Sequence, residues 1–160
     1  MSKVIKHPIA PVFDENSTVL ILGSFPSVKS REQTFFYGHK QNRFWQVLAK
    51  VFNEKIPETV EEKRAFLLFN RVAVWDVIAE CEITGSADSS IKSVKPNDLN
   101  VILNKAKIEK VFVNGKTAAK YYDKYIYEKI KIEAEILPST SPANAAWSLD
   151  RLVDAWCVIK

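Results

Sequence analysis

The sequence predicts an α/β fold: a three-layer αβα sandwich around a central parallel sheet of four strands. Short apolar runs alternate along the chain with segments of helical apolar spacing, the pattern of a parallel sheet covered by helices. The runs are continuous rather than alternating in polarity, as in strands buried on both faces. The 160 residues suffice to bury one core. We expect one domain over residues 1–160, with an N-terminal extension over 1–16 and a core from about residue 17 to residue 160.

Four apolar runs predict the strands of this sheet. The first run, TVLIL, ends at Gly23, and the third run, VFV, is followed by Asn114 and Gly115. Glycine gives the backbone freedom that a turn needs, and open α/β sheets bind ligands at the carboxyl ends of their strands. The predicted strands are residues 18–22, 72–75, 111–113 and 135–137.

Five segments with apolar residues at helical spacing predict the helices. In the first of them Phe44, Val47, Leu48 and Val51 share one face. The predicted helices are residues 43–52, 60–69, 97 or 98 to about 105, 116 to about 127, and 147 to about 157. The connection over residues 23–42 has no predicted element. It is long for an α/β loop and rich in aromatic residues, which indicates a functional loop.

Composition excludes several classes of protein. Hydrophobic residues make up 47% and charged residues 26%, as in an ordinary globular protein, so the chain is neither disordered nor fibrous. Two cysteines are too few for a disulfide-stapled scaffold. The net charge of +4 and the pI of about 9.0 form a mild basic bias that is compatible with nucleic acid.

Targeting and metal signals are also missing from the sequence. No apolar run approaches the ~18–20 residues of a membrane span, and no apolar segment follows the first lysines as in a secretory signal. We therefore expect a cytoplasmic protein without a membrane partner. The candidate ligands His7, His39, Cys81 and Cys157 are scattered, with no pair at metal-ligand spacing, so we expect no metal.

Three common catalytic patterns fail. NGKT at residues 114–117 lacks the first glycine of a phosphate-binding loop, because that position is Lys110. No G-x-S-x-G elbow of a serine hydrolase occurs. Asp76 is a single acid at a strand end, whereas a glycosidase of sugars needs two carboxylates.

Five motifs stand at predicted strand ends or in the aromatic loop. They are GSFPS at 23–27, FFYGHKQNRFW at 35–45, VAVWD at 72–76, VFVNG at 111–115 and LPSTSPANA at 137–145. In this order they resemble the uracil-DNA glycosylase superfamily, over residues 17–160. The most similar branch is the hypoxanthine-DNA glycosylases, which act on deaminated purines. The mismatch-specific uracil/thymine glycosylases are more distant.

The resemblance implies a uracil-DNA glycosylase-like fold and a monofunctional enzyme of base excision repair. Such an enzyme hydrolyses the bond between a deaminated base and deoxyribose in double-stranded DNA, after flipping the base into a pocket. The most similar branch points to hypoxanthine in deoxyinosine as the base. The resemblance implies no metal or other cofactor. No feature requires a protein partner, and we expect a monomer.

The catalytic residue that the resemblance implies is Asn42. Most of the superfamily holds Asn or Asp at the third position of the first motif, where it orients the attacking water. Here that position is Phe25, which cannot polarise water. The hypoxanthine branch takes its amide from the later motif, here QNRFW. We expect the Asn42 oxygen to accept a hydrogen bond from water while its NH₂ is anchored. Capping of the following helix is an alternative or additional role.

Aromatic residues are expected around the base. Tyr37 resembles the aromatic that stacks on the flipped base in mismatch glycosylases, which contributes roughly 1–3 kcal/mol per base. Any one of Phe35, Phe36 and Tyr37 could instead plug the loop onto the core. Phe25 would form the floor of the pocket. His39 would polarise a base carbonyl or contact phosphate, or else remain solvated.

Polar residues at two strand ends are expected to read the base edge. The Asp76 carboxylate could accept the N1–H of hypoxanthine, but it could not donate to a carbonyl as Asn does, which argues against strict uracil specificity. Alternatively, Asp76 organises the strand end against Ser86 or Ser89. Asn114 could donate to the base carbonyl, or form the turn with Gly115.

The LPSTSPANA segment resembles the loop that these enzymes push into the duplex. Its hydroxyls would contact phosphate, its prolines would stiffen the loop, and Ala143 or Asn144 would form the tip. The expected DNA-binding residues are Ser27, Ser139, Thr140, Ser141, Pro142, Ala143 and Asn144.

Two alternatives stay open on the sequence. Within the same class, the enzyme could release uracil or mismatched thymine. From another class, the chain could be a DNA- or nucleotide-binding module without activity, since Phe25 replaces the usual water-orienting residue.

Overall fold

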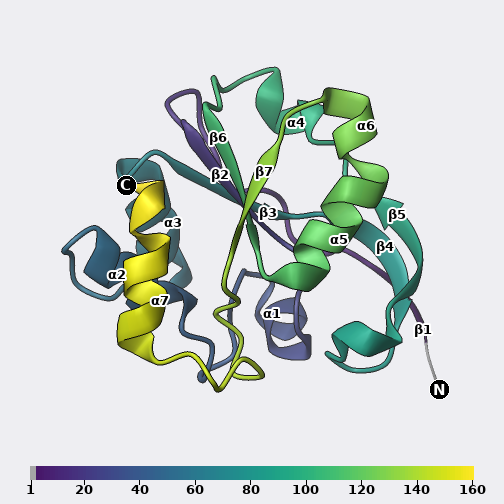
Figure 1. The fold of residues 1–160 in the computed structure, drawn as a ribbon, viewed down its shortest axis with the longest axis horizontal. Coiled ribbons are helices and arrows are strands. Elements are labelled where there is room, and N and C mark those ends of the chain that lie inside the picture. Colours follow the sequence, from purple (N-terminus) through teal and green to yellow (C-terminus); the bar gives the residue numbers. More distant parts are fainter. Residues whose placement is uncertain (1–2) are drawn as a thin grey trace.

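The predicted parallel sheet forms the centre of the molecule (Figure 1), as a computed structural model of residues 3–160 shows. Its strand order is β3-β2-β6-β7, and all neighbouring strands are parallel. The strands are β2 (Val19–Gly23), β3 (Val72–Asp76), β6 (Lys110–Asn114) and β7 (Ala134–Leu137). The four strand predictions are therefore confirmed to within one residue at each end. Residues 1–2 of the predicted extension lie outside the described residues.

The register of the sheet aligns the ends of its strands. Gly23 pairs with Asp76, and Asn114 pairs with Leu137. The middle of β2 has no exposed surface, because both of its faces are covered. Continuous apolar strands of this kind are typical of parallel sheets, and their carboxyl ends meet at one edge.

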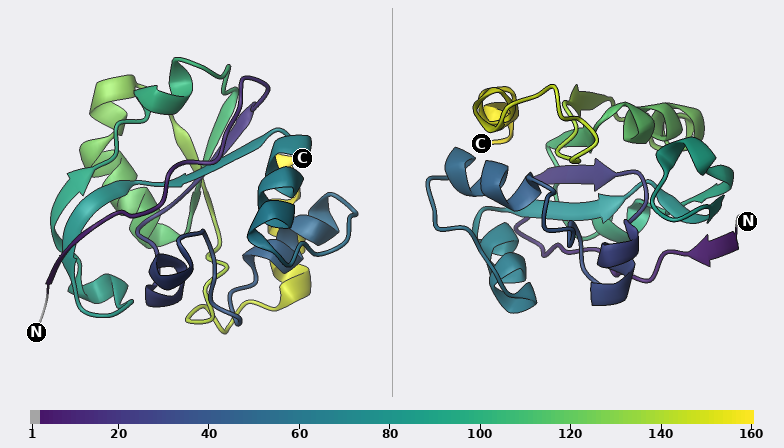
Figure 2. Two further views of the ribbon diagram at one scale, coloured as in Figure 1. Left: turned by 180° about the vertical axis from the view of Figure 1, so that it is seen from behind. Right: turned by 90° about the horizontal axis from the view of Figure 1, so that it is seen from below.

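Helices cover both faces of the sheet (Figure 2). The four longer ones are α2 (Phe44–Val51), α3 (Val60–Phe69), α5 (Lys116–Tyr125) and α7 (Leu149–Trp156), and α4 (Asn100–Leu103) is a single turn. Thr59 and Ser148 cap α3 and α7 by accepting hydrogen bonds from backbone N–H groups of the first turn. The five predicted helices are thus present. A further short helix, α6 (Tyr127–Ile130), begins where the fourth was predicted to end, and a 3-10 turn, η2 (Cys157–Ile159), follows the fifth.

A second, antiparallel sheet has no counterpart in the sequence prediction. It contains β1 (Lys3–Lys6), β4 (Ile78–Ile83) and β5 (Lys92–Pro96) in the order β1-β4-β5. The loop between β4 and β5 holds a 3-10 turn, η1 (Asp88–Ser90). Seen from behind, this sheet lies beside the parallel one (Figure 2, left).

The described part of the predicted N-terminal extension is built into the fold. The His7 N–H donates to the Ala79 carbonyl over 2.7 Å, and Val12 and Val74 exchange two backbone hydrogen bonds. The segment therefore runs antiparallel along β3 and the start of β4. This route brings His7 to the carboxyl end of β3.

The connection over residues 23–42 contains a short helix, α1 (Val28–Gln33), where no element was predicted. Ser27 caps it: the hydroxyl oxygen accepts a hydrogen bond from the Ser30 N–H over 3.2 Å. Figure 1 places α1 at the same end of the molecule as the loop that follows β7.

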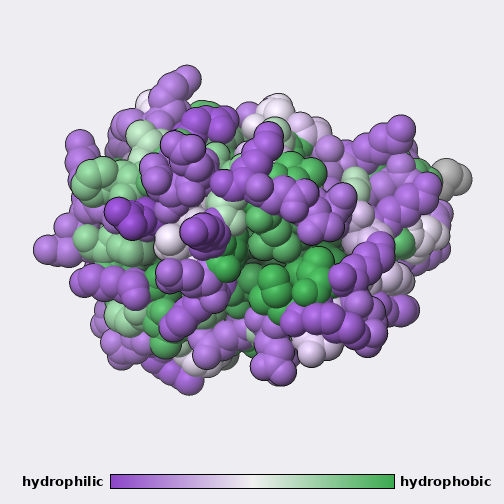
Figure 3. All heavy atoms as spheres, turned by 90° about the horizontal axis from the view of Figure 1, so that it is seen from above, coloured by the Kyte–Doolittle hydropathy of each residue, from purple (hydrophilic) through white to green (hydrophobic). Residues whose placement is uncertain are grey.

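The opposite end of the molecule, at the amino ends of the parallel strands, is mostly hydrophilic, with apolar side chains gathered near the middle of that face (Figure 3). Within residues 3–160, no helix has the length and apolar character needed to cross a membrane.

Candidate functional site

A pocket of about 370 Å³ lies at the carboxyl ends of the parallel strands. It is formed by the GSFPS segment, the aromatic loop, the ends of β3 and β6, the β4–β5 loop and the segment after β7. Of the predicted site residues, the pocket is lined by Phe25, Ser27, Tyr37, His39, Asn42, Asp76, Asn114, Ser139, Thr140, Ser141, Pro142 and Ala143. Only Asn144 is not part of the lining. The fold therefore gathers into one cavity residues that are more than 100 positions apart in the sequence.

A chain of three polar side chains fixes Asn42 in this pocket. Asn42 Oδ1 accepts two hydrogen bonds, from the Phe44 N–H and from Thr140 Oγ1, both over 2.9 Å. Thr140 Oγ1 in turn accepts from Asn114 Nδ2 over 3.0 Å, and the Thr140 N–H donates to Asn114 Oδ1 over 3.1 Å. Asn42 thus precedes α2, and Thr140 connects it to the end of β6.

This arrangement reverses the predicted orientation of the Asn42 amide. We expected a free oxygen and an anchored NH₂, but both lone pairs of the oxygen are used within the protein. The backbone N–H of Phe44 can only donate, so the oxygen assignment is fixed by its partner. The NH₂ makes no hydrogen bond within residues 3–160, and the residue lines the pocket. Asn42 therefore offers donors to a ligand.

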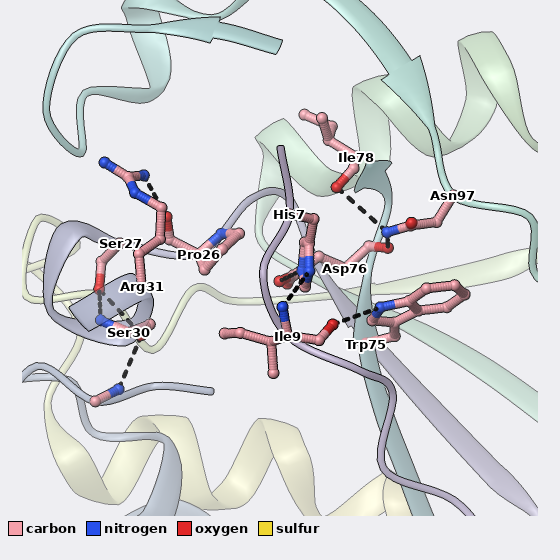
Figure 4. A network of polar contacts seen from close by, with 11 residues as sticks. His7, Ile9, Pro26, Ser27, Ser30, Arg31, Trp75, Asp76, Ile78 and Asn97 are labelled. Carbon is pink, nitrogen blue, oxygen red and sulfur yellow. Dashed lines mark hydrogen bonds and ion pairs between the residues drawn. The ribbon is translucent and has the colours of Figure 1, made fainter. Parts of the chain in front are cut away.

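Asp76 meets a partner that the sequence analysis did not identify. Asp76 Oδ2 lies 2.7 Å from Nε2 of His7, and both side chains are nearly inaccessible (Figure 4). The predicted partners Ser86 and Ser89 do not fill this role: Ser86 Oγ accepts from the Val28 N–H. The alternative of a serine partner was wrong, because the N-terminal segment, folded along β3, places His7 against Asp76.

Tyr37 has its ring and its hydroxyl in different environments. The ring stacks on Phe44, with centroids 3.9 Å apart and planes 12° apart, so one face is already covered. The hydroxyl is buried and makes no hydrogen bond within residues 3–160. Burial, and then the negative charge of Asp76, raise the pKa of the Tyr37 phenol. The hydroxyl is therefore a neutral group enclosed in the wall of the pocket.

Gly23 makes the close approach of these groups possible. A Cβ atom at this position would lie 2.4 Å from Asp76 Oδ1 and 3.1 Å from the Tyr37 hydroxyl. Both groups therefore pack directly over the end of β2. A side chain there would occupy the space that the carboxylate and the phenol use.

The remaining aromatic residues of the loop differ in role. Phe35 and Phe36 are 2% exposed and plug the loop onto the core. Phe25 lines the pocket, as expected, with its ring edge-on to His7 at 5.9 Å. His39 Nδ1 accepts from the Gln41 N–H over 3.1 Å, which leaves Nε2 of the neutral ring as a donor.

The loop after β7 is internally braced. Arg43 donates through its guanidinium to the carbonyl oxygens of Ser141, Asn144 and Trp147, and its N–H donates to the Thr140 carbonyl. A loop held in this way loses little entropy when it meets a ligand. Arg43 was not among the predicted site residues.

Several of the predicted DNA contacts are engaged within the protein. Thr140 is fully buried, so its hydroxyl is not available to phosphate, contrary to our expectation. Asn144 Nδ2 donates to the Ser139 carbonyl, which argues against Asn144 as the tip of the loop. Ser139 and Ser141 each accept a backbone N–H two residues ahead. Ala143 is exposed and remains suited to the tip.

A second acid, Asp88, lines the pocket from the β4–β5 loop and was missed by the sequence analysis. Burial of its carboxyl raises the pKa of Asp88, against the opposing effect of hydrogen bonds from the Thr117 and Ser24 hydroxyls. No motif marks it, because it stands in a serine-rich loop. Among residues 3–160, no group of three or more His, Cys, Asp or Glu side chains is placed to hold a metal ion.

Comparison with known proteins decides the family. Residues 10–160 match the model of the uracil DNA glycosylase superfamily. The chain belongs to this superfamily. A hypoxanthine DNA glycosylase from Methanosarcina acetivorans is 33% identical over 150 residues, which cover 92% of this chain and 94% of that protein. A hypoxanthine DNA glycosylase from Methanosarcina barkeri is 33% identical over 141 residues, 87% of this chain and 88% of that protein.

The fold agrees with this assignment. The solution NMR structure of a uracil DNA glycosylase candidate from Methanosarcina acetivorans superimposes with a TM-score of 0.82 at 31% identity, covering 98% of this chain and 97% of that chain. The resemblance inferred from five motifs and the predicted uracil-DNA glycosylase-like fold are thus confirmed. As a member of a DNA glycosylase superfamily, the chain has DNA as its substrate class, and the pocket lies where such a sheet binds ligands.

Proposed function

We propose that this protein is a monofunctional DNA glycosylase that releases hypoxanthine from deoxyinosine in double-stranded DNA. Two relatives that share a third of their residues over most of the chain bear the name hypoxanthine DNA glycosylase. The observation that carries the proposal is the pairing of an acceptor with a donor in one pocket: the Asp76 oxygen that His7 does not bind, and the NH₂ of Asn42.

This set of groups is complementary to a 6-oxopurine. Hypoxanthine has a donor, N1–H, next to an acceptor, O6. Asp76 accepts from the N1–H, and a donor of the pocket such as the Asn42 NH₂ serves O6. Adenine has no hydrogen at N1, so N1 and the carboxylate would both be acceptors. The pocket therefore favours the deaminated base over its parent.

In the proposed reaction the bond between C1′ and N9 breaks and its electron pair leaves with the base. Water adds at C1′ and releases a proton to solvent, which leaves an abasic site. Phe25 cannot polarise water, and the oxygen of Asn42 is occupied, so catalysis depends on stabilising the departing base. We assign this role to the Asn42 NH₂, held in place by Thr140. A positioned donor of this kind is worth roughly 10²–10³ in rate.

Base release from matched duplexes tests the proposal. Each duplex carries one deoxyinosine, deoxyuridine, deoxyxanthosine or G·T mismatch, and alkali cuts at abasic sites. We expect cutting mainly at deoxyinosine, and about a 100-fold slower rate for Asn42→Ala. Folding of the variant is checked by thermal unfolding. No cutting of any duplex by folded protein that still binds DNA would replace the enzyme with a binding module.

Release of uracil is the second candidate function. Asp76 would equally accept the N3–H of uracil, and the structural neighbour from Methanosarcina acetivorans is a uracil DNA glycosylase candidate. Preferential cutting at deoxyuridine would establish this function. It would keep the assigned pocket and reject the purine specificity.

A further inference from the structure

His7 lies outside every motif of the superfamily found in this sequence, yet its side chain is only 3% exposed and touches the pocket wall. It follows β1, where the chain turns to run along β3. Its ring packs against Phe25 at 5.9 Å, Phe36 at 6.1 Å and Trp75 at 6.5 Å. A polar ring enclosed by aromatic residues needs hydrogen bonds at both nitrogens.

The partners of the ring fix its tautomer. The Ile9 N–H donates to His7 Nδ1 over 3.2 Å, so Nδ1 carries no hydrogen. Nε2 of the neutral ring therefore carries it and donates to Asp76 Oδ2 over 2.7 Å (Figure 4). The imidazole is a rigid link between the backbone of the N-terminal segment and the carboxylate at the end of β3.

This link leaves Asp76 with one oxygen for the pocket. Oδ2 is taken by His7, whereas Oδ1 lies over Gly23. The backbone of the same residue is held from the other side, because Asn97 Nδ2 donates to the Asp76 carbonyl over 2.9 Å (Figure 4). The position of Oδ1 is thus set by residues from three separate parts of the chain.

We propose that His7 is a positioning residue for base recognition: by donating from Nε2 to Asp76 Oδ2 it holds Oδ1 where the N–H of the flipped base is read. The inference rests on the proposed function and assigns a residue to it that no motif contains. His7 acts through Asp76 and does not itself touch the base. Misplacing a reacting or recognising group by about 1 Å can cost about 100-fold in rate.

Two substitutions of similar polarity separate this role from a structural one. In His7→Gln the amide nitrogen stands near the position of Nε2 and can still donate to Asp76. In His7→Asn it stands near the position of Nδ1 and cannot reach. We expect single-turnover release of hypoxanthine to fall less than about 5-fold in the Gln variant and about 10–100-fold in the Asn variant.

Val12→Ala is the matched control for a loosened N-terminal segment. Val12 is buried and pairs with β3, but it does not contact the pocket. Its truncation lowers the unfolding temperature through lost packing alone. We expect the rate of base release below that temperature to stay within about 2-fold of the unaltered protein.

A double-mutant cycle completes the test. If His7 acts through Asp76, then adding His7→Asn to Asp76→Ala lowers the rate no further, although it can still lower stability. The proposal would be overturned if the Gln and Asn variants released hypoxanthine at equal rates. It would also be overturned if His7→Asn lowered the rate as much in the Asp76→Ala protein as in the unaltered protein. Failure of the unaltered protein to release hypoxanthine would instead refute the proposed function, so the two failures are distinguishable.

Discussion

Gly23→Ala adds a single methyl group at the end of β2, directly beneath Asp76, which we propose reads the base, and the Tyr37 hydroxyl. The new Cβ would stand 2.4 Å from Asp76 Oδ1, where ordinary contacts begin at 3.4 Å. The carboxylate must therefore move by about 1 Å. It cannot simply rotate away, because His7 holds Oδ2 and the stacked Tyr37 lies beside it.

The expected cost follows from this overlap. Overpacking by one carbon in a tightly packed region destabilises by about 1–3 kcal/mol. For a chain of this length that lowers the unfolding temperature by roughly 2–12 °C. A displacement of about 1 Å in the site reduces single-turnover base release about 100-fold. Both quantities are measured on the same preparation, by thermal unfolding and by alkaline cleavage of a deoxyinosine duplex.

Gly38→Ala is the matched control. A Cβ there would also meet an atom at 2.4 Å, but that atom is the side-chain oxygen of Gln33, an exposed residue that can move aside. We expect wild-type rate and an unfolding temperature within about 2 °C. If Gly23→Ala behaved like this control in both measurements, the argument that Asp76 and Tyr37 are fixed over β2 would be wrong.

Three further outcomes are expected. Thr140→Val removes a hydroxyl that donates to Asn42 and accepts from Asn114. We expect the free energy of unfolding to fall by about 1–3 kcal/mol and base release to slow. An unchanged rate would show that the hydrogen bond between Thr140 and Asn42 is not needed for catalysis. Arg43→Met frees the loop after β7, so affinity for an abasic duplex, followed by fluorescence anisotropy, should fall about 10-fold. Burial raises the pKa of the Cys81 thiol to about 11, so a disulfide reagent at pH 8 should label only the exposed Cys157 until the protein unfolds. Two rapidly labelled thiols in the folded protein would contradict this.

The parallel sheet could be predicted from sequence because each of its strands has a recognisable local pattern. TVLIL and VFV are continuous apolar runs with a glycine within two residues of their ends, and their burial on both faces leaves no alternation to interpret. The antiparallel sheet could not be predicted in the same way. Its β4 carries Glu80 and Glu82 among apolar residues, and it pairs with Lys3–Lys6, more than 70 residues earlier. Pairing at that distance leaves no local pattern.

The same distinction between local patterns and distant contacts applies to the residues of the site. Side chains at strand ends, such as Asp76 and Asn114, could be predicted to share a pocket because the ends of parallel strands meet at one edge. The Asn42 oxygen has two partners, the Phe44 N–H two residues ahead and the Thr140 hydroxyl 98 residues away, and the second could not be predicted from the sequence. Thr140 stands in a serine- and proline-rich loop, where the sequence does not distinguish a buried hydroxyl from a solvated one. No motif in the sequence indicated that His7 would contact the site.

The path of residues 3–12 decides where this chain can be cut or extended in the laboratory. The superfamily match begins at residue 10, three positions after the imidazole that supports Asp76. A chain trimmed to the matched residues would keep every motif and the whole parallel sheet, yet the carboxylate would lose its partner and β4 would expose an unpaired edge. A purification tag at the N-terminus would adjoin β1, the strand that pairs with β4. Tags therefore belong at the C-terminus, where the chain ends beside α7, at the opposite end of the molecule from the loop after β7 (Figure 1).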